Sequence, residues 1–124
     1  MRYLTIYTPN AKLTKRNEAG TPPSQEEITE MGKFIEEAAK AGVLLSGEGC
    51  APTSKGARVR LADGKFTVTD GPFTEAKELI AGFAILQTKT KAEAIEWSRR
   101  FLKVAGDGVS EVRLLHEATD FPPQ

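Results

Sequence analysis

Alternation between hydrophobic and polar positions predicts where the chain forms strands. Residues 2–8 alternate in this way, with Leu4 and Ile6 on one face. Tyr3 and Tyr7 lie on the other face, so both faces of this predicted strand carry bulky side chains. The polar segment 10–23 follows the strand and is rich in turn residues towards its end, which predicts a loop.

Two segments carry the signals of amphipathic helices. Ser24-Gln25-Glu26-Glu27 is a capping box that opens the first helix, and Gly42 is expected to end it. Its predicted apolar stripe consists of Ile28, Met31, Gly32, Ile35 and Ala39. Thr90-Lys91-Ala92-Glu93 is a second capping box. The stripe of the helix that follows is expected at Ala94, Ile95, Ser98, Phe101 and Leu102, with Trp97 at its edge.

Between the helices, a hairpin is predicted from two alternating segments, 57–61 and 65–69, which flank Asp63-Gly64. Asp-Gly is a strong signal for a type I′ turn. Further strands are predicted at three places, residues 43–45, 80–87 and 109–117.

The resulting order is β-α-β, a hairpin, then β-α-β, within one domain over residues 1–124. This is the ferredoxin-like α+β pattern, in which the helices cover one face of an antiparallel sheet. The other face still carries an apolar side chain, Phe83 or Leu86 depending on register. Because no element remains to cover that face, we expect a homodimer with sheet against sheet.

Composition narrows the class of protein. Lys and Arg number 17 and so do Asp and Glu, giving a net charge of +0 among 124 residues. This balance argues against direct nucleic-acid binding and against a membrane surface. No apolar run approaches the ~18 residues that a membrane span needs. Cys50 is the one cysteine, and the N-terminus does not resemble a signal peptide, so we expect a cytoplasmic protein.

The stretch Asp70-Gly71-Pro72-Phe73 is the most informative motif, because Gly-Pro forces a sharp turn after a predicted strand. Asp70 is a candidate general base if burial raises its pKa. The alternative is a turn cap, in which Asp70 accepts from the amides of Phe73 or Thr74.

Other candidates surround this turn. Glu48, in a Gly-Glu-Gly loop, is a candidate second carboxylate for acid–base work with Asp70. Arg58 and Arg60 share a strand face and form either an anion clamp or an exposed, charged hairpin. Further candidates for ligand contact are Tyr7, Phe73, Glu75 and Lys77, although Glu75, Lys77 and Glu78 also fit a solvated charged surface.

The remaining chemistry-bearing residues favour structural roles. Cys50 has no partner motif for nucleophilic catalysis, and His116 is a single histidine near the end of the chain. The sequence shows no metal-ligand cluster and no phosphate-binding glycine loop. We therefore predict neither a metal nor a cofactor.

With these motifs in place, the chain resembles the YCII-related proteins, and within them the DGPF-domain subgroup. The resemblance is carried by segments along nearly the whole chain: Tyr3-Leu4-Thr5-Ile6-Tyr7, Gly42 to Glu48 followed by Ala51-Pro52, Val59-Arg60 through Val68 to Glu78, Gly82-Phe83 and Ala94 to Trp97. It implies a dimeric α+β barrel of ferredoxin-like subunits. The broader superfamily includes enzymes that act on ring compounds, among them a dehydrochlorinating enzyme and muconolactone isomerases.

One departure from the family pattern concerns catalysis. The wider family pairs a histidine near the end of the first strand with an aspartate, whereas this segment, Tyr7-Thr8-Pro9-Asn10, has no histidine. Asp70 therefore matches the family motif without its histidine partner. Some relatives are associated with extracytoplasmic-type sigma factors.

Two hypotheses for function follow. In the first, the protein is a small-molecule enzyme or ligand binder with a cleft near Asp70 at the dimer interface. In the alternative, it is a non-catalytic dimeric regulatory module whose partner is a sigma factor.

Overall fold

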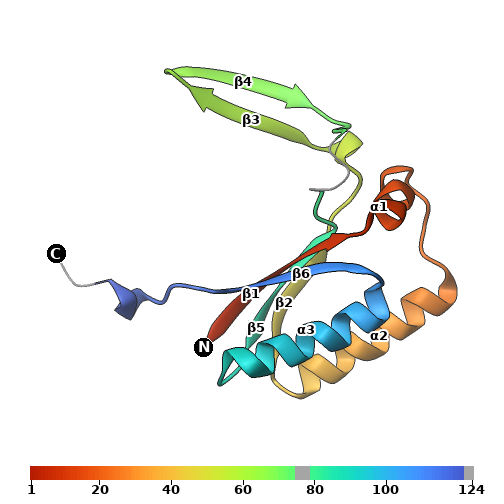
Figure 1. Cartoon of the computed structure of the whole chain (residues 1–124), viewed down its shortest axis with the longest axis vertical. Helices are drawn as coiled ribbons and strands as arrows, with labels where there is room; N and C mark the ends of the chain where they lie inside the picture. The colour runs from red at the N-terminus through yellow and green to blue at the C-terminus, as the bar shows by residue number, and fades with distance from the viewer. Residues whose placement is uncertain (75–78, 122–124) are drawn as a thin grey trace.

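The computed structural model describes residues 1–74 and 79–121, which form a four-stranded sheet with helices on one side and a separate two-stranded hairpin (Figure 1). In chain order the elements are β1 (Arg2–Pro9), α1 (Ala11–Glu18), α2 (Gln25–Lys40), β2 (Leu44–Gly49), the 3₁₀ turn η1 (Thr53–Lys55), β3 (Ala57–Ala62), β4 (Lys65–Asp70), β5 (Gly82–Gln87), α3 (Lys91–Ala105), β6 (Gly108–Leu114) and the 3₁₀ turn η2 (Ala118–Asp120).

The main sheet has the strand order β2-β5-β1-β6, and every neighbouring pair is antiparallel. Two β-α-β units, β1-α2-β2 and β5-α3-β6, supply these strands, and β3 and β4 are inserted between them as a hairpin. This confirms the ferredoxin-like α+β fold predicted from the order of the elements.

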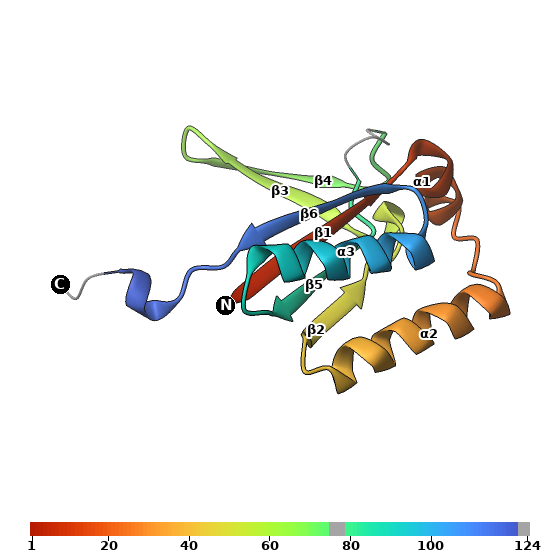
Figure 2. The same cartoon turned by 60° about the horizontal axis from the view of Figure 1, so that its bottom comes forward.

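Helices α2 and α3 lie side by side over one face of the sheet (Figure 2). The core beneath them contains Tyr3, Tyr7 and Leu86, which are at most 8% exposed. The Tyr7 ring meets the Phe101 ring edge-on, with centroids 5.1 Å apart. Phe34 of α2 lies 6.0 Å from Phe101, which joins the two helices through aromatic contacts.

Both predicted capping boxes mark the start of a helix. Ser24 and Glu27 bond reciprocally, with N···O distances of 3.1 and 2.9 Å. At α3 the Thr90 hydroxyl accepts from the Glu93 amide, but the Glu93 carboxylate accepts from the amide of Lys89, one residue before the cap.

The predicted loop over residues 10–23 was wrong for its first half, which is helix α1. Asn10 caps this helix by accepting from the Leu13 amide at 2.9 Å. Thr14 is 3% exposed, so one side of α1 is covered by the rest of the protein. A short helix with mostly polar residues has little hydrophobic periodicity, and contacts with the body stabilise it.

The predicted apolar stripe of α2 was also wrong in its phase. Ile28 and Ile35 are 51% and 46% exposed, whereas Phe34 and Ala38 face the core. Packing of Phe34 against Trp97 and Phe101 sets which side of this helix faces the core.

The face of the sheet opposite the helices is open within the described chain. Pairing places Leu4 opposite Ile85 and Ile6 opposite Phe83 on this face. Phe83 is 39% exposed and Leu86 is buried, which settles the register that the sequence left undecided. In the described part of the chain, no helix combines the length and apolar character needed to cross a bilayer.

Candidate functional site

The β3–β4 hairpin leaves the body of the protein at a root formed by η1 and the turn after β4 (Figure 1). At its tip Asp63 and Gly64 have φ values of 50° and 79°, as the predicted type I′ turn requires. Two of the predicted site residues, Asp70 and Phe73, lie at this root, since Asp70 is the last residue of β4 and Phe73 belongs to the turn that follows.

Gly71 allows the root to close. Its amide donates to the Gly56 carbonyl at 2.9 Å, which joins the two strand ends. A Cβ atom at this position would lie 1.7 Å from the carbonyl oxygen of Thr53. Only glycine therefore permits this approach of two backbones.

Thr53 connects the turn to helix α1. Its amide donates to the Glu18 carboxylate at 2.8 Å, and its hydroxyl donates to the same carboxylate. The Thr53 hydroxyl in turn accepts from the Phe73 amide at 3.0 Å. The Phe73 amide therefore donates to Thr53 and not to Asp70. Of the two amides that Asp70 was expected to cap, this one was predicted wrongly.

One face of the hairpin is polar, cationic and hollowed. The residues that line an open hollow of about 450 Å³ on this face are Arg58, Arg60, Ala62, Lys65, Thr67 and Thr69. Strand alternation brings them together, because β3 and β4 pair Arg58 with Thr69 and Arg60 with Thr67. The Arg58 guanidinium lies over the Phe73 ring, 3.9 Å from its centroid, so the aromatic ring of the turn supports the root of this face.

Asp70 belongs to the opposite face of the same hairpin. It pairs with Ala57 and follows Val68 on alternate positions of β4, whereas Thr69 lies on the polar face. Asp70 is exposed. The structure therefore brings Arg58 to Phe73 of the turn and places Arg58 and Arg60 in one hollow, but it puts Asp70 on the opposite face of the ribbon from both arginines.

Glu48 and Tyr7 lie on the main sheet. Glu48 is exposed on β2, opposite Phe83 and on the open face. Tyr7 instead lies beneath the helices, where its hydroxyl donates to the Gly106 carbonyl at 2.8 Å. Burial raises the pKa of Tyr7, and the nearby Asp107 carboxylate adds to the rise.

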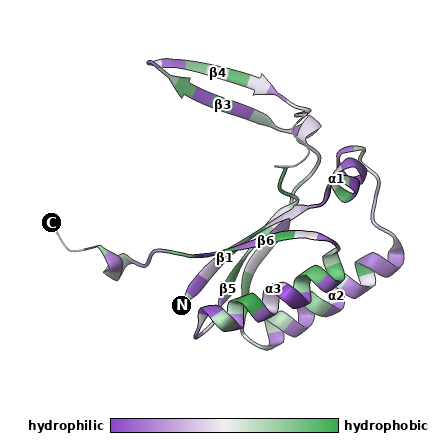
Figure 3. Ribbon diagram, viewed as in Figure 1, coloured by the Kyte–Doolittle hydropathy of each residue, from purple (hydrophilic) through white to green (hydrophobic). Residues whose placement is uncertain are grey.

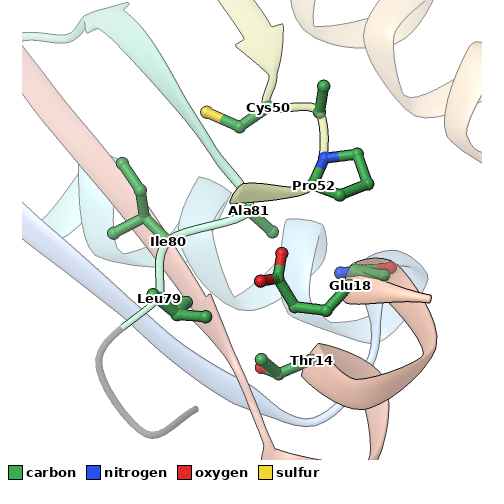
Figure 4. A pocket seen from close by; sticks show the side chains of 9 residues that line it. Thr14, Glu18, Cys50, Pro52, Leu79, Ile80 and Ala81 are labelled. Carbon is green, nitrogen blue, oxygen red and sulfur yellow. The ribbon is translucent and has the colours of Figure 1, made fainter. Parts of the chain in front are cut away.

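A second, much smaller hollow of about 20 Å³ lies between α1 and the segment before β5 (Figure 4). Glu18 and Thr14 project into it from α1, and Leu79 faces them. This volume holds about one water molecule, so we regard the hollow as a packing gap between α1 and the segments beside it.

Two of the predicted ligand contacts, Glu75 and Lys77, lie outside the described residues. Exposed Cys50 borders the small hollow, and His116 lies 3.6 Å from Asp120 near the chain end. In the described ranges no three His, Cys, Asp or Glu side chains are grouped to hold a metal ion.

Sequence reasoning missed Glu18 and Thr53, the two side chains that hold the turn. They are 35 residues apart in the chain, and no short motif joins them. The one local signal was Asn10, a residue type that commonly caps helices and could have indicated α1.

Comparison with known proteins agrees with this architecture. The solved structure of 5-chloro-2-hydroxyhydroquinone dehydrochlorinase from Burkholderia phenoliruptrix AC1100, in complex with 2,5-dihydroxybenzoquinone, has the same fold, with a TM-score of 0.51 at 12% identity over 97% of this chain and 98% of that one. An uncharacterised protein of Rhizobium meliloti (strain 1021) is 35% identical over 67 residues, 54% of this chain and 51% of that protein. The matched segment is thus about half the length of that relative. The YCII-related domain matches residues 1–118. The chain therefore belongs to the YCII-related family.

Proposed function

We propose that this protein binds a small anionic or oxygen-rich ring compound on the polar face of the hairpin, as an enzyme or as a ligand binder. The observation that carries the proposal is the 450 Å³ hollow with Arg58, Arg60 and Lys65 in its lining. That volume is within the range of about 300–1,000 Å³ typical of small-molecule sites.

The chemistry of the lining supports this class of ligand. Guanidinium groups bind carboxylates and other oxyanions with two parallel hydrogen bonds. Thr67 and Thr69 add hydroxyl groups that donate to, or accept from, ring oxygens. The dehydrochlorinase with the similar fold binds 2,5-dihydroxybenzoquinone, which is a compact ring bearing oxygens.

We propose that Asp70 lies at the seam of a homodimer. If the protein is an enzyme, we assign Asp70 and Glu48 acid–base roles towards a substrate on the Asp70 side of the hairpin, because the ribbon separates Asp70 from the cationic hollow. The open sheet face, with Leu4, Ile6 and Phe83, supports a second subunit on that side. Within the family, the Asp70–Phe73 turn supports placement in the DGPF subgroup. The single cysteine supports a cytoplasmic location.

Calorimetric titration with 2,5-dihydroxybenzoquinone, and separately with benzoate, tests the binding site. Arg60→Gln removes one cation of the hollow and is expected to weaken binding at least about tenfold, the loss of one charge-assisted hydrogen bond. Arg99→Gln is the matched control, since Arg99 is an exposed arginine of α3 whose side chain is 69% exposed. The proposal fails if neither compound binds, or if both variants bind as tightly as the unchanged protein.

Asp70→Asn separates binding from chemistry. Because Asp70 lies on the other face of β4, this variant is expected to keep its affinity for the probe. A proton acceptor must lie within hydrogen-bond reach of its substrate, so a role of Asp70 as base would appear as lost turnover of a substrate bound on the Asp70 side, at unchanged affinity for the probe in the hollow. Loss of affinity in Asp70→Asn with none in Arg60→Gln would move the site to the opposite face.

The alternative function, a regulatory module that contacts a sigma factor, stays a prediction. It is favoured by the segment Tyr7–Asn10, which lacks the histidine of the suspected acid–base couple. A pull-down that recovers a sigma factor, together with no ligand binding, would favour this alternative.

A further inference from the structure

The two arginines of the cationic hollow differ in how they are held. Both lie on the polar face of the hairpin, along which hydrophilic and hydrophobic residues alternate in each strand (Figure 3). The central carbon of the Arg58 guanidinium lies 3.9 Å from the centroid of the Phe73 ring. Arg60 makes no hydrogen bond, ion pair or ring contact with any residue in the ranges 1–74 and 79–121. Within these ranges, Arg58 is therefore the arginine of the hollow that a neighbouring side chain holds in place.

The ring beneath Arg58 belongs to the turn after β4, and a distant part of the chain fixes its backbone. The Phe73 amide donates to the Thr53 hydroxyl at 3.0 Å. That hydroxyl donates to the Glu18 carboxylate, which also accepts from the Thr53 amide at 2.8 Å. These three residues are each partly buried, so competition from water for their hydrogen bonds is reduced. A continuous series of contacts thus runs from helix α1 to the arginine of the hollow.

Within this turn the chain crosses from one side of the hairpin to the other. Asp70 lies on the face opposite the arginines, yet the ring of Phe73 lies beneath Arg58 of the polar face. The crossing depends on Gly71, since an added Cβ atom there would lie 1.7 Å from the carbonyl oxygen of Thr53. The turn motif therefore places an aromatic ring against a cation of the hollow.

An arginine that is held before binding loses less conformational freedom when a ligand arrives. Ordering a long side chain on binding lowers affinity by roughly two- to tenfold. The ring attracts the positive charge through its π-electrons, whereas a carboxylate binds to the N–H groups at the edge of a guanidinium. The contact with the ring is therefore compatible with anion binding by the same arginine.

We propose that Phe73 is a positioning residue of the hollow, because it holds Arg58 where the guanidinium binds an oxyanion of the ligand. Thr53 and Glu18 in turn hold Phe73. This inference rests on the proposed function, since it states how the same site recognises its ligand. Arg58 then supplies a fixed cation at the root of the hairpin, and Arg60 supplies an adaptable one beside it.

Ring-current shifts measured by NMR test the contact without any ligand. The side-chain proton signals of Arg58 are expected to lie upfield of ordinary arginine positions, because the guanidinium lies over the Phe73 ring. Phe73→Leu removes the ring and should abolish the upfield shift. Unshifted signals in the unchanged protein, or a shift that persists in Phe73→Leu, would overturn the inference.

The same signals test the series of hydrogen bonds behind the ring. Thr53→Val removes the hydroxyl and should reduce the upfield shift of the Arg58 signals. Thr53→Ser should restore it, because serine offers the same donor and acceptor. A full shift in Thr53→Val would overturn the part of the inference that assigns Thr53 and Glu18 to hold the ring.

Calorimetric titration with benzoate then measures the effect on binding. Arg58→Gln is expected to weaken binding at least about tenfold, and Phe73→Leu by roughly two- to tenfold. Phe73→Tyr keeps an aromatic ring in the turn and should retain most of the affinity. Phe66→Leu is the matched control, because it makes the same exchange on the opposite, apolar face of the hairpin. It is expected to leave the affinity unchanged.

The double variant distinguishes positioning from a merely structural role. If Phe73 acts through Arg58, then Phe73→Leu causes no further loss of affinity when Arg58→Gln is already present. A structural Phe73 would shape the whole root, so its loss would weaken binding by the same factor with and without Arg58→Gln. That equal loss would overturn the inference.

Two further results separate this inference from the proposed function. If neither benzoate nor 2,5-dihydroxybenzoquinone binds the unchanged protein, the proposed function fails and the inference fails with it. If Arg60→Gln weakens binding but Arg58→Gln and Phe73→Leu do not, the hollow is the binding site and only the inference fails. Circular dichroism and hydrogen exchange of the amides paired between β3 and β4 check that each variant keeps the hairpin folded.

Discussion

Replacement of Gly71 by alanine is predicted to destabilise the β3–β4 hairpin (residues 57–70, here called the arm) while leaving the rest of the protein folded. The added Cβ would lie 1.7 Å from the Thr53 carbonyl oxygen, 2.5 Å from its carbon and 3.1 Å from the Ser54 nitrogen. All three are backbone atoms, so the strand end must move by more than about 1 Å to restore ordinary contact distances. This movement strains the bonds from Gly71 to Gly56 and from Phe73 to Thr53.

The magnitude follows from these contacts. Overpacking against a fixed backbone costs about 1–3 kcal/mol, and each of the two strained hydrogen bonds contributes about 0.5–1.5 kcal/mol. We therefore expect the root to be destabilised by at least about 2 kcal/mol. The four-stranded sheet makes no comparable contact with Gly71, so the loss is expected in local opening of the arm.

Native-state hydrogen exchange measures this local opening. The amides paired between β3 and β4 are expected to exchange about 30-fold faster in Gly71→Ala, the rate equivalent of about 2 kcal/mol. Gly32→Ala is the matched control. Gly32 lies inside α2 with no atom within 4 Å of an added Cβ, so this variant should be more stable by about 0.5–1 kcal/mol. Unchanged arm exchange in Gly71→Ala would refute the reasoning.

Two further predictions concern hydrogen bonds. Thr53→Val removes the hydroxyl that bonds to both Glu18 and Phe73 and should destabilise the root of the hairpin by about 1–3 kcal/mol. Thr53→Ser keeps a hydroxyl and should retain most of that stability. Hydrogen exchange of the amides paired between β3 and β4 distinguishes the two variants. The Arg16 guanidinium, followed by the helix cap, lowers the pKa of Glu27 from 4.5 to about 2. Because the folded pKa lies below the unfolded one, this contribution is complete above about pH 5 and is lost as the pH falls towards 2. The melting temperature of the unchanged protein should therefore fall more steeply over that range than that of Glu27→Gln, and parallel curves would contradict the prediction.

Local signals were sufficient for most of the elements. The capping residues Ser24 and Thr90 mark the starts of α2 and α3, and Asp63-Gly64 marks the hairpin tip. These predictions were right because each depends on hydrogen bonds or dihedral angles within a few residues. Element order then gave the ferredoxin-like fold, since few topologies join short antiparallel strands through helices.

Local signals failed where packing chooses between alternatives. On α2 the sequence favoured a stripe through Ile28 and Ile35, but the aromatic contact of Phe34 with α3 selected the neighbouring one. Helix α1 was missed because its polar residues show no clear period and its support comes from the body of the protein.

In the candidate site, too, some features could be predicted from the sequence and others could not. Alternation along β3 and β4 was readable in the sequence, and it put Arg58 and Arg60 on one face of a hairpin. Two other contacts join segments that are far apart in the chain: the close approach of Gly71 to the Thr53 backbone, and the hydrogen bond from Thr53 to Glu18. No local pattern indicated either of them.

The sequence by itself determined every strand of the sheet, the two long helices, their order and the two-faced character of the hairpin, because these follow from periodicity and from bonds between near neighbours. The tertiary structure alone decided which faces remain uncovered, which side of the ribbon carries Asp70 and how the turn is held. The physical reason is that burial and backbone contact depend on the position of the whole chain in space, and no short segment fixes that position.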